Sequence, residues 1–211
     1  KDVWLIHEPM AAAIGIGIDV LEPKGNMVID IGGGTTEIAV ISLGGIVCDK
    51  SIRIAGDEFT DNIKNYMKTR HNIAIGDIMA EQTKIYVGSA LTELEEAPPN
   101  YAVHGRDLMS GIPKEIVVTY KEIAGALNNS IEQIEEAVMS ALFNTPPALS
   151  ADIYNEGVYL TGGGSMLRGL DKRISSKTKL PVYVAEDPLR AVARGTGIAL
   201  KNTENYTFLI Q

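Results

Sequence analysis

The apolar residues in the first quarter of the chain fall in short runs that glycines interrupt. Three extended runs, at residues 27–31, 37–43 and 46–54, are separated by residues 32–34 and 44–45, which are all glycine. Glycine supplies tight turns without steric cost, so this pattern predicts a β-meander of three strands.

Elsewhere the apolar residues recur every three or four positions, which is the period of an amphipathic helix. A capping box at Thr119 and Glu122 marks the start of one long helix, and Pro146-Pro147 marks its end. Helices are predicted over residues 10–17, from 57 through 67, around 78–85, from 119 to 145, and over 167–175 and 188–200.

The remaining segments are short apolar runs between turn residues. Residues 92–111, which include two prolines, are expected to be loop with room for one short strand. Further strands are predicted at residues 115–119, 158–160 and 182–185. Because strands and helices alternate after residue 157, the tail is typical of βα units in an α/β fold.

The composition is that of a folded chain with an acidic surface. Of the 211 residues, 45% are hydrophobic, and 27 acidic against 19 basic side chains give a net charge of −8. This charge disfavours nucleic acid, so a bound phosphate has to be met by backbone N–H groups or a metal ion. The single cysteine, Cys48, excludes an internal disulfide and favours a cytoplasmic location. The start at Lys1 without a methionine leads us to expect a piece of a longer protein.

The first glycine-rich segment lies directly after a predicted strand. Asp30 stands near the end of the apolar run, and Gly32, Gly33 and Gly34 follow it. The N–H groups of such a turn are open to an anion because no side chains cover them. The pattern predicts either a phosphate clamp beside an acid or a plain glycine hairpin turn with an exposed Asp30.

The second glycine-rich segment follows another buried strand. Gly162, Gly163 and Gly164 come after the strand, and we expect a helix to begin shortly afterwards. A helix N-terminus favours phosphate, or lets a nucleoside lie flat on the backbone. The alternative is a tight strand-to-helix connection. Neither segment has the spacing of a Rossmann or P-loop motif.

Three charged residues are further candidates. Glu8 precedes Pro9 at the start of a small-residue helix that can pack close to a neighbouring backbone, but the helix dipole alone also favours an acid there. Glu81 and Lys84 lie one helical turn apart, and by itself such a pair is typical of a solvated helix face.

Taken together, several segments resemble the actin-like ATPase superfamily, and within it the MreB family of bacterial actins. The resemblance covers essentially all 211 residues and is carried by EPMAAAIG, NMVIDIGGGTTEIAVISLGGIV, SIRIAGDEF, TPPALSADI, GVYLTGGGSMLRGLD and AEDPLRAVARGTG. It implies a ribonuclease-H-like lobe, with a mixed sheet and flanking helices, over residues 1–55 and 126–211. Residues 56–125 would form a smaller inserted α+β subdomain.

The resemblance also implies roles in a site for ATP and Mg²⁺. Asp30 resembles the aspartate that holds the metal through water, and Glu8 resembles the residue that orients the attacking water. The other implied contacts are those of Gly32, Gly33, Gly34 and Thr35 with the phosphates, of Gly162, Gly163, Gly164, Ser165 and Met166 with the adenosine, and of Glu81 and Lys84 with adenine and ribose.

For the intact protein the resemblance implies ATP hydrolysis and self-association into filaments that control rod cell shape. It implies partners in the cell-wall elongation machinery and a cytoplasmic, membrane-associated cytoskeleton. The family's first phosphate hairpin and its membrane anchor have no counterpart in these residues. The isolated chain is therefore expected to be inactive. In the intact protein, membrane contact is expected only through the N-terminal part that is missing here. His7 stands where the family usually has an acid, and is interpreted as tolerated variation.

Two alternatives of other classes stay open. One is a non-hydrolysing actin-like binding module that docks on partner proteins, which the missing phosphate hairpin favours for this chain. The other is an actin-like sugar kinase lobe, although no sugar-binding insertion is recognisable.

Overall fold

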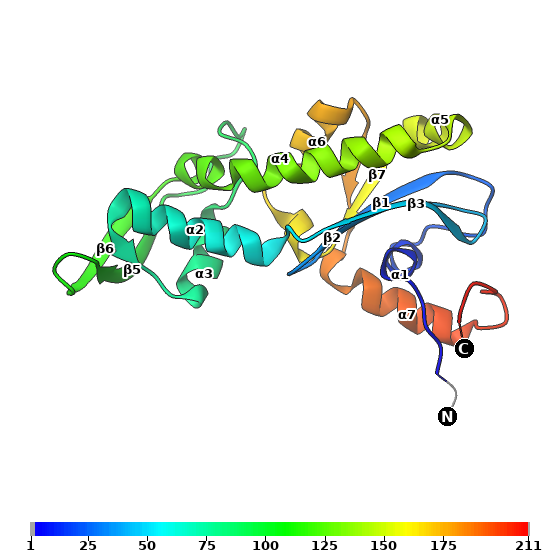
Figure 1. Cartoon of the computed structure of the whole chain (residues 1–211), viewed down its shortest axis with the longest axis horizontal. Coiled ribbons are helices and arrows are strands. Elements are labelled where there is room, and N and C mark those ends of the chain that lie inside the picture. The colour runs from blue at the N-terminus through cyan, green and yellow to red at the C-terminus, as the bar shows by residue number, and fades with distance from the viewer. Residues whose placement is uncertain (1–2, 211) are drawn as a thin grey trace.

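The computed structural model describes residues 3–210 and contains two β-sheets joined by long helices (Figure 1). The larger sheet has five strands in the order β3-β2-β1-β7-β8. Its strands are β1 (Asn26–Ile31), β2 (Thr36–Ser42), β3 (Gly45–Ile52), β7 (Val158–Thr161) and β8 (Val182–Val184). The first three are antiparallel neighbours, which confirms the predicted meander, and β7 runs parallel to both β1 and β8.

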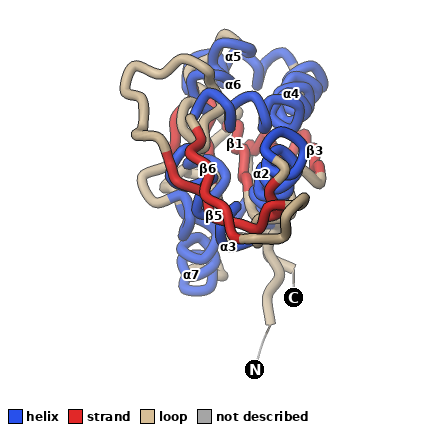
Figure 2. The backbone as a smooth tube through the Cα atoms, turned by 90° about the vertical axis from the view of Figure 1, so that its left-hand side faces the viewer, coloured by secondary structure: helices blue, strands red, loops and turns tan. Residues whose placement is uncertain are grey.

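The smaller sheet lies at the far end of the molecule from the two chain termini (Figure 1). Its three strands are antiparallel, in the order β4-β5-β6, and Figure 2 views the molecule from this end. The elements of this end are α2 (Gly56–His71), β4 (Ile73–Ala74), α3 (Asp77–Val87), β5 (Tyr101–Asp107) and β6 (Pro113–Val118).

Helices cover both faces of the larger sheet (Figure 1). The remaining elements are α1 (Glu8–Gly15), α4 (Tyr120–Asn144), α5 (Pro147–Glu156), α6 (Leu170–Thr178), α7 (Ala191–Lys201) and the 3-10 turns η1 (Gly163–Met166) and η2 (Pro188–Arg190). Alternate residues of β1 divide between the faces. Val28 packs with α1 and α7, whereas Met27 and Ile29 pack in the cluster that includes α4 and α6. The strand is therefore buried on both sides, which explains its continuous apolar run.

Helices α1 and α7 cross with their backbones in contact at two glycines. Gly15 faces the carbonyl of Ala191 and Gly195 faces the carbonyl of Ala11, so close that neither glycine has room for a Cβ atom. This contact accounts for the small-residue composition of α1, whose seven residues from Pro9 onward are all buried.

Helix α4 extends from the smaller sheet to the larger one (Figure 1). The predicted capping box is present: Glu122 N–H donates to Thr119 Oγ1 at 3.3 Å, and Thr119 N–H donates to Glu122 Oε2 at 2.9 Å. The division of the chain into residues 1–55 plus 126–211 and 56–125 stays a prediction, and its second boundary lies within this continuous helix.

Several elements differ from the sequence-based expectation. Residues 101–107, in the stretch expected to be mostly loop, form the seven-residue strand β5. Residues 147–156 form α5, which was not predicted. Pro146-Pro147 was interpreted only as the end of α4, whereas Pro147 is also the first residue of α5, a position that proline favours. The helix expected from residue 167 begins at Leu170, after the turn η1. None of the helices within residues 3–210 is long and apolar enough to cross a membrane.

Candidate functional site

The two glycine-rich segments lie at one edge of the larger sheet. One leaves β1 and the other leaves β7, and these parallel neighbours are in register, with Asp30 opposite Thr161. The carboxyl ends of parallel strands meet at the same edge, which is where open α/β sheets bind ligands. The fold thus brings together two segments that are far apart in the sequence.

The second glycine-rich segment packs directly against β1. Gly162 has φ +79°, and a Cβ atom there would collide with the Asp30 carboxylate and the Ile31 carbonyl. A Cβ atom on Gly164 would collide with the side chain of Ile31. Two of the three glycines are therefore required by packing. The predicted helix N-terminus is not at this loop, because η1 and Gly169 separate it from α6, so the helix-dipole argument was wrong here.

The first glycine-rich segment is a four-residue hairpin between β1 and β2 that docks on the start of α2. Gly32 N–H donates to Thr35 O at 2.9 Å and closes the turn. The carbonyls of Gly32 and Gly33 accept from Gly56 N–H at 3.1 Å and Asp57 N–H at 2.8 Å. These bonds satisfy two N–H groups that a helix start leaves without internal partners. These hydrogen bonds hold the turn in place. The space beside Gly34 is open, since a Cβ atom there would meet no atom within 4 Å.

A cavity of about 680 Å³ separates the two loops from α3. Its volume suits a ligand of the size of a nucleotide. It is lined by Gly32, Gly33, Gly56, Asp57, Phe59, Glu81, Lys84, Ile85, Gly88, Gly163, Gly164, Met166, Leu167, Arg168 and Leu189. Seven of these were candidate residues from the sequence. The other candidates are not part of the lining: Glu8, Asp30, Gly34, Thr35, Gly162 and Ser165.

Lys84 is held inside the cavity wall rather than on a solvated helix face. Its Nζ donates to Glu81 Oε2 at 2.7 Å, to Gly56 O at 2.8 Å and to Thr60 Oγ1 at 3.1 Å, and its side chain is 15% exposed. Burial raises the pKa of Glu81, but hydrogen bonds from Lys84 and Thr60 outweigh it and hold the pKa below its usual value. The pair therefore ties α3 to the start of α2 and presents its charges to the cavity.

Asp30 is buried close to two other carboxylates. It is 4% exposed, and burial followed by the charges of Glu8 and Glu37 raises the pKa of Asp30 to about 6. Burial, Glu8 and Asp49 likewise raise the pKa of Glu37, against the opposing effect of His7. Burial and neighbouring acids thus raise the pKa of both Asp30 and Glu37, and a bound cation would offset this concentration of negative charge. Within residues 3–210, no three His, Cys, Asp or Glu side chains are placed to ligate a metal by themselves.

Several cavity residues were missed by the sequence analysis. Asp57 lies 3.5 Å from the position of a Cβ atom on Gly33, and its position in the first turn of α2 was the available signal. Arg168, Ile85 and Leu189 carried no signal, because their place in the wall depends on how α3 and η2 pack against the loops.

The family model for MreB/Mbl proteins matches residues 1–207. The chain belongs to the MreB/Mbl family. Among curated members, the cell shape-determining protein Mbl of Bacillus subtilis is 47% identical over 204 residues, and the cell shape-determining protein MreB of Escherichia coli is 48% identical over 203 residues. The alignments cover 97% and 95% of this chain but only 61% and 57% of those proteins, so the chain spans about three fifths of the length of its MreB/Mbl relatives.

Solved structures of the family superimpose closely on this chain. MreB 5 of Spiroplasma citri bound to AMPPNP matches with a TM-score of 0.90 and 40% identity, over 94% of this chain and 59% of that one. A second structure of that protein, bound to ADP, gives a TM-score of 0.91. The MamK double helical filament matches with a TM-score of 0.70 at 22% identity and shares the fold alone. The actin-like α/β fold expected from the sequence is confirmed.

Proposed function

We propose that this chain is the nucleotide-binding second half of an MreB-type actin, and that the complete protein binds and hydrolyses ATP with Mg²⁺. The observation that carries the proposal is the cavity of about 680 Å³ at the shared edge of β1 and β7, between two glycine loops and α3. The two Spiroplasma citri structures, one bound to AMPPNP and one to ADP, support a nucleotide as the ligand.

The residues of the cavity fit the parts of a nucleotide. Gly163 and Gly164 present bare backbone next to Met166 and Leu167, a surface on which a purine and ribose can lie. On the facing wall Glu81 supplies carboxylate oxygens that can accept hydrogen bonds, and Lys84, whose N–H groups already bond to Glu81, Gly56 and Thr60, supplies positive charge. In this proposal the adenosine lies between η1 and α3.

The phosphates lie along the hairpin of residues 32–35. In a chain of net charge −8, backbone N–H groups on an uncovered glycine turn are the appropriate anion donors. The hydrogen bonds from α2 to Gly32 and Gly33 hold this turn in place before any ligand arrives, and such preorganisation favours binding.

Asp30 and Glu8 act at the phosphate end. Asp30 would hold Mg²⁺ through water, and the ion would supply positive charge that offsets the phosphates. Glu8, at the first position of α1 and close enough to Asp30 to raise its pKa, orients the attacking water and draws a proton from it. The remaining phosphate contacts belong to the part of the protein outside these 211 residues.

In the complete protein, nucleotide-driven closure of the two halves favours the conformation that stacks into filaments. The filaments act in the cytoplasm at the membrane, together with cell-wall elongation proteins, and control rod cell shape. The names of the curated relatives, cell shape-determining proteins, support this part of the proposal.

The test is calorimetric titration of the full-length protein with ADP and AMPPNP in the presence of Mg²⁺. Gly33→Val places a side chain over the phosphate turn; its Cβ atom lies in ordinary contact, 3.5 Å from the Asp57 carboxylate. We expect this variant to lose at least about tenfold in affinity, and the control Gly76→Ala, outside the cavity, to bind normally. Full-length protein that binds no nucleotide overturns the proposal, and binding without hydrolysis favours a binding module.

A further inference from the structure

Arg168, which follows η1, is bonded to the end of α3 and to the segment after it. The Nη1 atom of Arg168 donates to Ile85 O at 2.9 Å and to Gly88 O at 3.4 Å, at the C-terminal end of α3. The backbone carbonyl of the same residue accepts from Ala90 N–H at 2.8 Å. A cation on the last carbonyls of a helix also favours its dipole. Arg168 thus holds this segment with both its side chain and its backbone.

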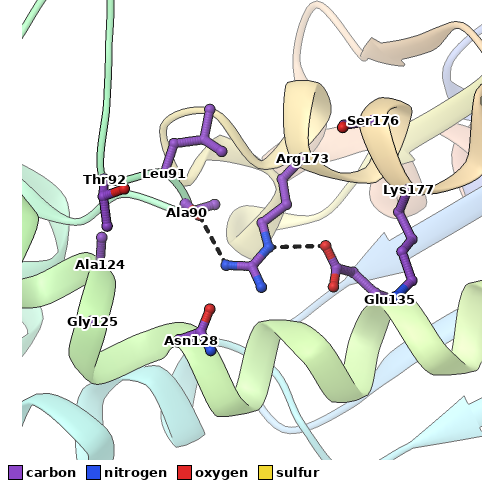
Figure 3. Close-up of a pocket in the computed structure, with 10 residues that line it drawn as sticks. All are labelled: Ala90, Leu91, Thr92, Ala124, Gly125, Asn128, Glu135, Arg173, Ser176 and Lys177. Atoms are coloured by element: carbon purple, nitrogen blue, oxygen red, sulfur yellow. Dashed lines mark hydrogen bonds and ion pairs between the residues drawn. The ribbon is translucent and has the colours of Figure 1, made fainter.

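A second arginine, Arg173 of α6, bonds to the same segment at Ala90 (Figure 3). Arg173 Nη1 donates to Ala90 O at 3.0 Å, while its Nε donates to Glu135 Oε1 of α4 at 2.9 Å. The side chains of this ion pair are 16% and 8% exposed, beside a separate cavity of about 460 Å³. A partly buried ion pair stabilises little by itself, but its fixed geometry specifies where the bonded carbonyl lies.

These contacts lie where the two walls of the cavity come together. Lys84, Ile85 and Gly88 form one wall, and Met166 and Leu167 form the other, immediately before Arg168. The walls meet closely at Gly88, where a Cβ atom would collide with the Lys84 carbonyl and would touch Leu167 at 3.0 Å. A change in the position of Ala90 or Gly88 therefore changes the width of the adenosine end.

We propose that Arg168 and Arg173 are positioning residues that hold the end of α3 against η1 and so set the width of the adenosine part of the cavity. This proposal rests on the proposed function. Neither residue is assigned a part in the chemistry, because both act through the backbone of residues 85–90.

The test compares full-length variants by calorimetry with ADP and AMPPNP and by steady-state ATP hydrolysis. Arg168→Ala removes both side-chain bonds, and Arg168→Lys keeps a charge that can reach one carbonyl. Lys172→Ala is the matched control: Lys172 also joins α6 to the segment after α3, through Glu95 at 3.1 Å, but the pair is exposed and outside the cavity. Thermal unfolding without nucleotide shows that each variant is folded.

We expect Arg168→Ala to weaken ADP and AMPPNP binding equally, by about tenfold, and to raise KM with kcat within about twofold. Arg173→Ala should weaken binding to a similar extent. The affinity of Arg168→Lys should lie between those of Arg168→Ala and the unsubstituted protein, and the Lys172→Ala control should bind like the unsubstituted protein. Equal affinities in the Arg168→Ala and unsubstituted proteins would overturn the positioning role. So would a lowered kcat at unchanged KM. Unsubstituted protein that binds no nucleotide would instead overturn the proposed function, and this inference with it.

Discussion

The raised pKa of Asp30 has a measurable consequence for stability. A carboxyl group whose pKa rises from 3.8 when unfolded to about 6 when folded binds more protons in the native state between these pH values. Stability from this group is therefore present below about pH 4 and is lost as the pH rises through 6. Asp30→Asn should stabilise the nucleotide-free 211-residue chain at pH 7.5 by about 1 to 2 kcal/mol, and by much less at pH 4. Urea unfolding at the two pH values measures this; equal effects at both would contradict it.

Glu8 and Asp30 should respond differently to substitution in the full-length protein. Glu8→Ala should reduce kcat about a hundredfold while leaving the affinity for AMPPNP nearly unchanged. Orienting the attacking water stabilises the transition state of hydrolysis but does not contribute to the binding of the nucleotide. Asp30→Ala should weaken both binding and turnover. Calorimetry and phosphate release separate the two patterns, and identical behaviour of the variants would show that the roles are assigned wrongly.

Some candidate residues could be picked out from the sequence because their signals are local. The placement of Asp30 and both glycine segments at the ends of buried strands could be predicted, since an acid and uncovered glycines directly after an apolar run are visible in a single stretch. The contacts of Lys84 with Gly56 and Thr60 could not, because they depend on how α3 lies against α2.

At the scale of elements, the crossing of α1 and α7 is the contact least tolerant of change. Gly195→Ala in the 211-residue chain places a methyl group against the Ala11 carbonyl, and we expect a loss of at least about 2 kcal/mol in the free energy of unfolding. Gly197→Ala, two residues further along α7 and in open space, should instead stabilise by up to about 1 kcal/mol. Urea denaturation of both variants checks this, and similar effects of the two would show that the crossing is not tightly packed.

Elements with a clear apolar period were predictable and others were not. The meander and α4 follow from glycine spacing, a capping box and a regular apolar face. The short strand β4 and the half-buried strand β5 have no such period, because β5 buries only Val103 fully. Strands of this kind are stabilised by pairing with neighbours that a local pattern does not reveal.

At the scale of the whole molecule, the 211-residue chain should bind ATP weakly and hydrolyse none measurably. It spans about three fifths of its relatives' length, and in the proposed function the remaining phosphate contacts come from outside these 211 residues. Calorimetry and phosphate release test this. Micromolar affinity with Mg²⁺-dependent turnover would show that the chain is self-sufficient.

Assembly should show the same dependence on the complete protein. Open-ended stacking needs two complementary surfaces in a fixed relative orientation, and the proposed closure of the cleft provides it. Full-length protein with ATP should pellet and scatter light above a critical concentration, whereas the 211-residue chain at equal concentration and salt should stay in solution. Filaments of the shorter chain without nucleotide would contradict gating by closure.

The length of α4 gives the molecule a mechanical property. A helix of 25 residues is about 37 Å long, and α4 forms part of the apolar core against both sheets. Because it is continuous, it acts as a stiff lever: a tilt of about 5° where it meets the larger sheet displaces its other end by about 3 Å. A small adjustment near β3 is thereby amplified into a displacement of the distant hairpin of β5 and β6, with no hinge needed along the way.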